Sequence, residues 1–545
     1  VEPVIDDTGF RFNVRIGTPT DPSAVKSGTK LARGSNFKCL MSDTPIAADY
    51  IKDESAAGRM GTRLLAIVVD VGRGRIYLSP NRQCEDLALA ATPEWEPDSE
   101  TPAQLTGGGA QAHRYGLKTW ASLFTKRQLV AMTTLSDLVG DVSTQILRDA
   151  QVAGVSDDSQ SLADGGIAAS AYTDAVCVYL ALGVSKLSDY GSALVVWSPT
   201  RDQIKTTFAR QALPMAWDFA ETNPFANAAG DLTVTLNGIL RTVAELRAEV
   251  PGCVFQLDAQ TQGLSQQRFV STDPPYYDNI AYADLSDFFY VWLRRSLRRV
   301  YPQLFATLAV PKTEELVAMP YRHGTRDRAE KFFLDGMTLA MQNIAASVHP
   351  AAPVTIYYAF KQSETESRGT NSTGWETFLE AVNRAGLALT GTWPMRTERA
   401  DRSISLGTNS LASSIILVCR SRAHEAQSIS RRQFIRELNA ALPLALDAMT
   451  RESEGLHSPV APVDLSQAII GPGMAVFSKY SAVLEADGSP MSVRSALQII
   501  NRFLAEDDFD SDTQFCLHWF EQYKWESGKF GEADVLARAK GTSVD

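Results

Sequence analysis

The stretch RFVSTDPPYYDN at residues 268–279 decides the fold expected for this chain. Apolar and β-branched residues lead directly into an aspartate and two prolines, a pattern typical of a strand that ends in a loop. A helix rich in aromatic residues is expected shortly after the loop, over Asp284–Val300. Because ligands of α/β proteins bind at the carboxyl ends of strands, a functional site is expected at the end of this strand.

Strands and helices alternate on both sides of this stretch. Upstream, Cys253–Leu257 has the pattern of a strand that ends at Asp258. The elements expected downstream are, in chain order, the helix Ala329–Ala346, the strand Val354–Phe360, the helix Gly374–Ala385 and the strands Leu387–Trp393 and Ser414–Cys419. This order predicts an α/β fold with a parallel sheet covered by helices. The last two strands are expected to form an antiparallel hairpin at the sheet edge.

A chain of 545 residues is too long for a single core, so several domains are expected. Four regions differ in pattern: short strands and turns over residues 1–110, a mainly helical region at 111–250, the α/β pattern at 251–425, and a helical region at 426–545. Within the second region, Leu232–Leu236 is expected to be a short strand, and Ile239–Val250 a helix.

Composition narrows the possible classes of protein. No apolar run approaches the roughly 20 residues that a membrane helix requires, so no membrane association is expected. The six cysteines form no C-x-x-C pair, which is consistent with a reducing cytoplasm. The net charge of −11 means that binding to nucleic acid would require a local basic face.

The tetrapeptide Asp273-Pro274-Pro275-Tyr276 has the residue types needed to activate an exocyclic amine. Such an amine on adenine or cytosine is a poor nucleophile, because its lone pair is delocalised into the ring. The Asp273 carboxylate and the Pro274 carbonyl can accept its two N–H groups and turn the lone pair toward a methyl donor. Tyr276 can stack on a base flipped out of the duplex. The alternative is a rigid turn in which Tyr276 is only a packed aromatic.

The residues after this tetrapeptide add further candidates for contact with DNA. Tyr277 and Asn279 place aromatic and polar groups beside the loop. The helix that follows carries four arginines at positions i, i+1, i+4 and i+5, which are Arg294, Arg295, Arg298 and Arg299. This basic face is expected either to contact the DNA backbone or to be a solvated helix end stabilised by the helix dipole.

Several strings together carry a resemblance to a known family. They are residues 271–279 with the helix string DFFYVWL at 287–293, YGLKTWASLF at 115–124, FARQALPM at 208–215, WDFAE at 217–221 and TWPMRTE at 392–398. They resemble the large adenine-specific DNA methylases that have a zinc-ribbon-like insertion, a family often linked to anti-phage gene clusters. The similarity extends over most of the chain.

This resemblance implies a Rossmann-like methyltransferase sheet that uses S-adenosylmethionine, with a β-rich N-terminal insertion and a helical C-terminal region. It implies that Asp258 contacts the adenosyl part of the cofactor. Two features depart from the family: no Gly-rich donor loop follows a first strand, and residues 36–43 keep only Cys39 where the family often has paired cysteines. One thiolate cannot build a four-ligand zinc site, so no metal is expected.

The sequence therefore predicts a DNA adenine-N6 methyltransferase of a restriction or anti-phage system. Its donor site is expected to need a missing N-terminal segment or a separate subunit, with other defence proteins as further partners. Two alternatives stay open. Cytosine-N4 methylation uses the same acceptors, and a DNA-recognition or scaffold subunit could retain the loop without catalysis.

Overall fold

The computed structural model divides into two compact units. Unit 1 comprises Val1–Gly252 and Ala281–Glu315, and unit 2 comprises Cys253–Ile280 and Leu316–Asp545. The structure describes residues 1–358, 373–396, 413–450 and 468–502, with short gaps at 8, 32–33, 73, 106–107, 247–249, 251 and 279, and parts of 512–544. No helix in these described parts is long and apolar enough to cross a membrane.

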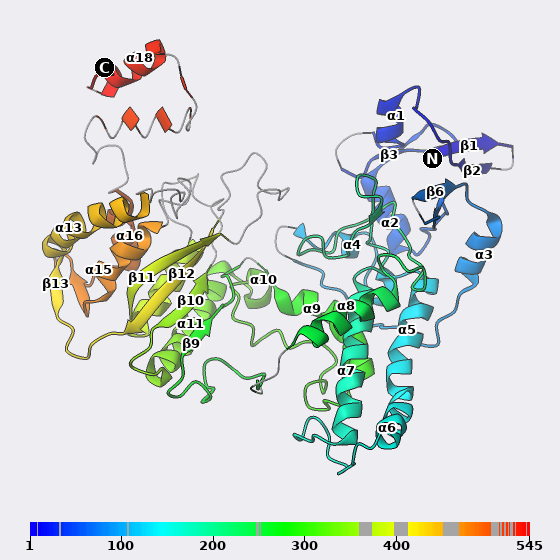
Figure 1. The fold of residues 1–545 in the computed structure, drawn as a ribbon. Helices are drawn as coiled ribbons and strands as arrows, with labels where there is room; N and C mark the ends of the chain where they lie inside the picture. Colours follow the sequence, from blue (N-terminus) through cyan, green and yellow to red (C-terminus); the bar gives the residue numbers. More distant parts are fainter. Residues whose placement is uncertain are drawn as a thin grey trace. The chain divides into compact units, whose positions relative to one another are not determined.

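Unit 1 begins with small antiparallel pairs of strands separated by short helices (Figure 1). The pairs are β1 (Glu2–Asp6) with β2 (Gly9–Asn13), β3 (Phe37–Lys38) with β4 (Pro45–Ile46), and β5 (Ile67–Asp70) with β6 (Arg75–Leu78). Helices α1 (Pro22–Ser27) and α2 (Ala48–Ala56) lie between these pairs, and α3 (Arg82–Ala90) follows the third pair. The strand pattern expected for residues 1–110 is therefore present, together with helices that were not expected.

A group of packed helices follows in unit 1: α5 (Lys126–Asp141), α6 (Ser143–Val152), α7 (Ala169–Ser188), α8 (Leu232–Glu245) and α9 (Tyr282–Leu297). Helix α5 begins with a capping box, in which the Thr125 hydroxyl accepts the Gln128 N–H and the Gln128 side chain accepts the Thr125 N–H. Aromatic rings connect α9 to the segment just before α5. Phe288 of α9 stacks on Phe124 with 5.5 Å between ring centroids.

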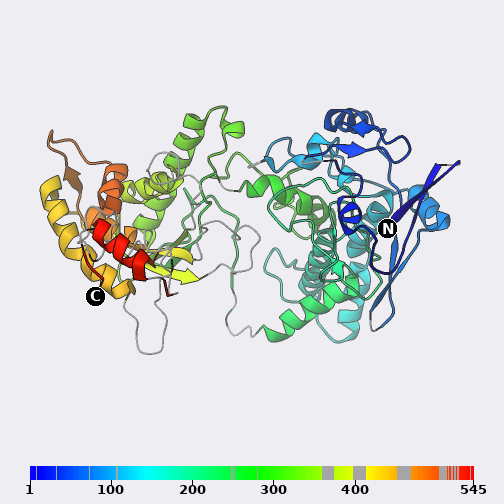
Figure 2. The ribbon, with the colours of Figure 1, turned by 90° about the horizontal axis from the view of Figure 1, so that it is seen from above.

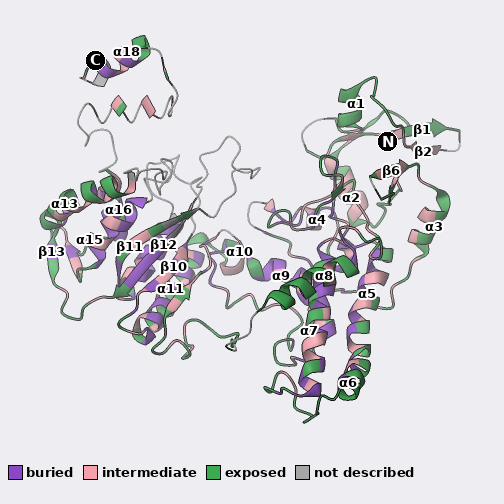
Figure 3. Ribbon diagram, viewed as in Figure 1, coloured by how far each residue is buried: buried purple, intermediate pink, exposed green. Residues whose placement is uncertain are grey.

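The strand expected at Leu232–Leu236 is wrong. These residues form the first turns of α8, whose N-terminus is capped by the Asp231 carboxylate accepting the Val234 N–H at 2.9 Å. Leu236 and Ile239 lie against Gly183 of α7, where the missing side chain allows close approach. Helix α8 has no fully buried residue, and its ribbon is largely coloured as exposed (Figure 3).

Unit 2 is built on a four-stranded mixed sheet in the order β11-β12-β10-β9. Its strands are β9 (Val270–Thr272), β10 (Val354–Tyr358), β11 (Leu387–Arg396) and β12 (Ser413–Ser421). The expected antiparallel hairpin of β11 and β12 is confirmed, with β11 at the sheet edge. The expectation of a parallel sheet holds only for β9 and β10, because β12 is antiparallel to β10.

Helices α11 (Arg326–Ser347) and α12 (Thr373–Arg384) pack together and contact the sheet. The C-terminal helices α13 (Arg431–Thr450), α15 (Ile470–Ser478) and α16 (Val493–Arg502), coloured yellow to orange, gather together in both ribbon views (Figures 1 and 2). Strands β13 (Ser428–Ser430) and β14 (Ala482–Leu484) form a separate parallel pair. A shared apolar core, which includes Ile356, Phe378 and Leu417, lies among these elements and the sheet.

Candidate active site

The candidate site lies at the carboxyl end of β9, an edge strand of the sheet. Its register with β10 pairs Val270 with Val354 and Thr272 with Ile356. Alongside this ladder, the Thr355 hydroxyl donates to the Ser271 hydroxyl at 2.9 Å. Asp273 is the first residue beyond the strand and is exposed, whereas Pro274 after it is buried. The sheet therefore presents the Asp273 carboxylate to solvent from an anchored strand end.

Tyr276 connects this carboxylate to the core of unit 2. Its hydroxyl donates to Asp273 Oδ1 at 2.8 Å, and its ring meets the ring of Tyr358 at 5.3 Å in an edge-on arrangement. Tyr358 is the last residue of β10, is 3% exposed and stacks on Phe378 of α12 at 4.1 Å. Burial, helped by the nearby Asp278 charge, raises the pKa of Tyr358, so this phenol stays neutral.

Tyr277 has a different role from the one expected. Its backbone is left-handed, with φ of 44°, and its side chain is only 6% exposed. The ring packs edge-on against Phe333 of α11 at 5.2 Å, and the backbone carbonyl accepts the Ala318 N–H at 2.9 Å. A bulky residue in this conformation costs on the order of 1–3 kcal/mol, which the surrounding contacts must offset. Tyr277 is thus a core residue in this structure, not an exposed group beside the loop.

The expected strand at Cys253–Leu257 is wrong. The segment pairs with no described strand, and its apolar side chains face solvent: Val254 is 97% exposed, Phe255 62% and Leu257 55%. Asp258 lies in the turn that follows, where its carboxylate accepts the Gln260 N–H at 2.9 Å. A strand needs a neighbour for its backbone groups, and none of the described residues supplies one here.

The expected cofactor does not fit the described residues. A donor molecule requires backbone that approaches closely, usually at glycines, next to the strand ends. Gly263 is the described glycine closest in sequence to β9, and no side chain or backbone atom lies within 4 Å of a Cβ placed there. Asp258 is exposed in its turn. The described glycine nearest to β9 in sequence and Asp258 therefore form no cradle for S-adenosylmethionine.

The arginines expected to bind DNA lie in unit 1, on α9 and just beyond it. Arg294 donates to the Thr307 carbonyl at 2.8 Å, and Arg299 donates to the Ser143 hydroxyl at 2.8 Å. Arg295 forms an ion pair with Asp137 of α5 at 2.5 Å and lies over the Trp95 ring. Arg298 is exposed. Three of the four guanidinium groups therefore bond within unit 1, and Asn279 lies outside the described residues.

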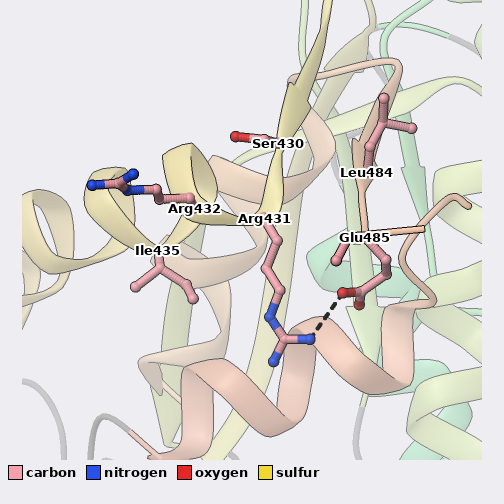
Figure 4. A pocket seen from close by; sticks show the side chains of 7 residues that line it. Ser430, Arg431, Arg432, Ile435, Leu484 and Glu485 are labelled. Carbon is pink, nitrogen blue, oxygen red and sulfur yellow. Dashed lines mark hydrogen bonds and ion pairs between the residues drawn. The ribbon is translucent and has the colours of Figure 1, made fainter. Parts of the chain in front are cut away.

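A cavity of unit 2 lies elsewhere, at the pair β13–β14 (Figure 4). It is lined by Ser430, Arg431, Arg432, Ile435, Leu484, Glu485 and Ala486. Arg431 and Glu485 form an ion pair of 2.8 Å across it. No residue of the Asp273 loop lines this cavity. In the described parts of the chain, no three His, Cys, Asp or Glu side chains are grouped so that they could hold a metal ion.

The sequence patterns did not identify the residues that pack against Tyr276 and Tyr277. Tyr358 was expected only as part of a strand, and Gly374 only as a helix start. A Cβ at Gly374 would lie 2.9 Å from the Cβ and Cγ atoms of Tyr277, so only glycine fits there without a shift. The alternation of β10, which buries Val354, Ile356 and Tyr358, is the signal that could have assigned Tyr358 to the core.

Comparison with known families adds one match. Residues 510–545 match the model of a domain of unknown function (DUF8807). This match covers only the C-terminal end of the chain, including α18 (Phe530–Lys540), and none of the residues around Asp273. Neither a curated protein nor a solved structure matches the chain.

Proposed function

We propose that this chain is the base-binding, catalytic half of an S-adenosylmethionine-dependent DNA amino-methyltransferase that acts on adenine N6. The observation that carries the proposal is the exposed Asp273 carboxylate at the end of β9, held 2.8 Å from the Tyr276 hydroxyl. An acidic acceptor, a proline carbonyl and an aromatic ring can together bind and orient the amine of a flipped base.

In this proposal Asp273 and the Pro274 carbonyl accept the two N–H groups of the adenine amine. When both N–H groups donate hydrogen bonds to these acceptors, a pyramidal nitrogen is favoured, and its lone pair then points away from the ring. Tyr276 packs against the base, because its ring is only partly buried and its position is fixed by the edge of Tyr358. Its hydroxyl occupies one carboxylate oxygen in this structure, so the amine must share or replace that hydrogen bond.

The donor site is proposed to come from other polypeptide sequence, either an additional segment or a separate subunit. Two features of unit 2 support this. The outer edge of β9 has no partner among the described strands, and the apolar side chains of Val254, Phe255 and Leu257 face solvent. Unpaired strand edges and exposed apolar groups are surfaces that a further part of a sheet covers.

The biological setting is part of the same proposal. The resemblance to methylases of anti-phage gene clusters supports a role in restriction or defence, with DNA as the substrate and other defence proteins as partners. Because the net charge is −11 and three arginines near α9 bond within unit 1, contact with DNA is proposed to be local, at the Asp273 loop. Arg298 of unit 1 is a separate candidate for contact with phosphate.

The test is calorimetric titration of S-adenosylmethionine into the chain alone and into a combined sample, in which the chain carries the sequence encoded next to it and is mixed with the products of the adjacent genes. Binding is expected only in the combined sample. Transfer of a labelled methyl group to DNA, followed by nucleoside analysis, then distinguishes N6-methyladenine from N4-methylcytosine. No binding in either sample would overturn the enzyme proposal and favour a DNA-recognition or scaffold subunit.

A further inference from the structure

The backbone of the Asp273 loop turns sharply just behind its functional residues. Tyr277 donates its N–H to the Pro275 carbonyl at 3.2 Å, which closes a turn around Tyr276. The left-handed conformation at Tyr277, with φ of 44°, then reverses the chain. Residues with a Cβ rarely adopt this conformation, so contacts from outside the turn must hold it in place.

Three contacts from other elements hold this residue. Gly374 at the start of α12 lies directly against the Tyr277 side chain, with no room for a Cβ. Phe333 of α11 meets the Tyr277 ring edge-on at 5.2 Å. The Ala318 N–H donates to the Tyr277 carbonyl at 2.9 Å. The side chain and the carbonyl of one residue are therefore fixed by three separate segments of unit 2.

We propose that Tyr277 is a positioning residue, whose ring against Gly374 and Phe333 holds the turn that aims Asp273 and Tyr276 at the substrate amine. β9 holds the chain before Asp273, and Tyr358 contacts the Tyr276 ring, but neither contact holds the backbone that follows Tyr276. Tyr277 is the adjacent residue with a buried ring, and its anchoring limits the positions open to Tyr276. The kinetic part of this inference rests on the proposed methyl transfer; the structural part does not.

Four substitutions in the full chain test this inference. Tyr277→Gly permits the left-handed backbone but removes the ring, whereas Tyr277→Phe keeps the ring. Gly374→Ala keeps Tyr277 and pushes its ring away. Gly391→Ala in β11 is the matched control, because a Cβ there meets nothing within 4 Å. If Tyr277→Gly fails to fold, Gly374→Ala carries the test alone.

The first measurement is hydrogen exchange at the Ala318 amide, with amides of β10 as an internal reference. Tyr277→Gly and Gly374→Ala are expected to speed exchange at Ala318 by about tenfold or more while β10 stays protected. Tyr277→Phe and Gly391→Ala are expected to match the wild type. Unchanged exchange at Ala318 in both disruptive variants would overturn the inference, whether or not the protein methylates DNA.

The second measurement is labelled-methyl transfer to DNA, made with each variant in the same combined sample that is used for the wild type. A loop displaced by about 1 Å is expected to lower kcat on the order of 100-fold, with a smaller change in KM. Rescue by Tyr277→Phe is expected. A purely structural role would instead lower the unfolding temperature and leave kcat per folded molecule unchanged, which also overturns the inference. Absence of transfer by the wild type counts against the proposed function, and the exchange data then decide about Tyr277.

Discussion

Two stretches of unit 2 have the same sequence signature but different structures. Residues 253–258 and 268–273 each have a strand-like pattern of apolar and β-branched residues and end in an aspartate, Asp258 and Asp273. The second run contains β9, which pairs with β10 in a regular parallel register. The first run forms no strand, and its apolar side chains face solvent. An apolar pattern therefore predicts what a segment can form, whereas a neighbouring strand decides whether it does.

The difference also separates the two aspartates chemically. Asp273 is held at a strand end, with Tyr276 and the buried Tyr358 behind it. Asp258 is held by local turn contacts, in which its carboxylate bonds to Gln260 and its carbonyl accepts the N–H groups of Thr261 and Gln262. A group that must orient a reacting atom needs a rigid support, so of the two aspartates Asp273 is the one that fits the proposed reaction.

The largest effect is expected from replacing the two aspartates in turn. Asp273→Ala should lower methyl transfer on the order of 10³-fold or more, because it removes the charged acceptor for the amine. Asp258→Ala should leave both donor binding and transfer nearly unchanged, because its carboxylate bonds to Gln260 within an exposed turn. Labelled-methyl transfer over a range of donor concentrations separates the two. Equal losses in kcat would show that the two loops have one function.

The next effect concerns stability. Ile356→Ala, in β10 opposite Thr272, should lower the free energy of unfolding by about 2–5 kcal/mol, because Ile356 is fully buried. Leu257→Ala, in the unpaired run, should change it by less than about 0.5 kcal/mol. Urea titration of the chain alone measures both. A large loss from Leu257→Ala would mean that residues 253–257 are packed in solution.

Substitutions of Tyr276 should have intermediate effects on activity. Tyr276→Ala removes the surface for stacking and should weaken transfer by about 10- to 100-fold, since a stacked base contributes roughly 1–3 kcal/mol. Tyr276→Phe keeps the ring and loses the bond to Asp273. It should stay within about tenfold of the wild type. A Phe variant as weak as the Ala variant would show that the hydroxyl, not the ring, supports catalysis.

The smallest effect is a dependence of stability on pH in α12. Burial raises the pKa of Glu376 above its usual value, although Arg494 forms an ion pair with it at 2.7 Å. The folded state therefore binds this proton more tightly than the unfolded state does. The associated stability is present below the unfolded pKa and is lost as the pH rises through the folded pKa.

Glu376→Gln should remove this pH dependence and change the free energy of unfolding at pH 7 by no more than about 1 kcal/mol. Urea titrations at several pH values from the acidic range to neutrality measure the slope. A slope that stays the same in the Gln variant would contradict the assignment to Glu376.

Periodic elements with local signals could be predicted from the sequence. The helices α9, α11 and α12 and the hairpin of β11 and β12 were all expected close to their observed positions. Leu232–Leu236 failed because a short apolar run fits either a strand or a helix, and the Asp231 cap favours the helix. Pattern alone could therefore not choose between the two structures.

In the candidate site, the position of Asp273 at a strand end was predictable, but its support was not. Tyr277 adopts a left-handed backbone because Gly374, 97 positions later, leaves space for its ring. Arg295 bonds to Asp137, 158 positions earlier in the chain. Contacts over such separations depend on the tertiary fold, and local periodicity carries no information about them.

The bond between the Ala318 N–H and the Tyr277 carbonyl has a practical consequence for protein engineering. Unit 2 is interrupted in sequence by Ala281–Glu315, which belong to unit 1. Because this 2.9 Å bond holds the chain on both sides of the interruption together, Ile280 and Leu316 leave and re-enter unit 2 near one another. Residues 281–315 thus leave unit 2 and return to it close to where they left, and a short turn in their place would make unit 2 a continuous chain.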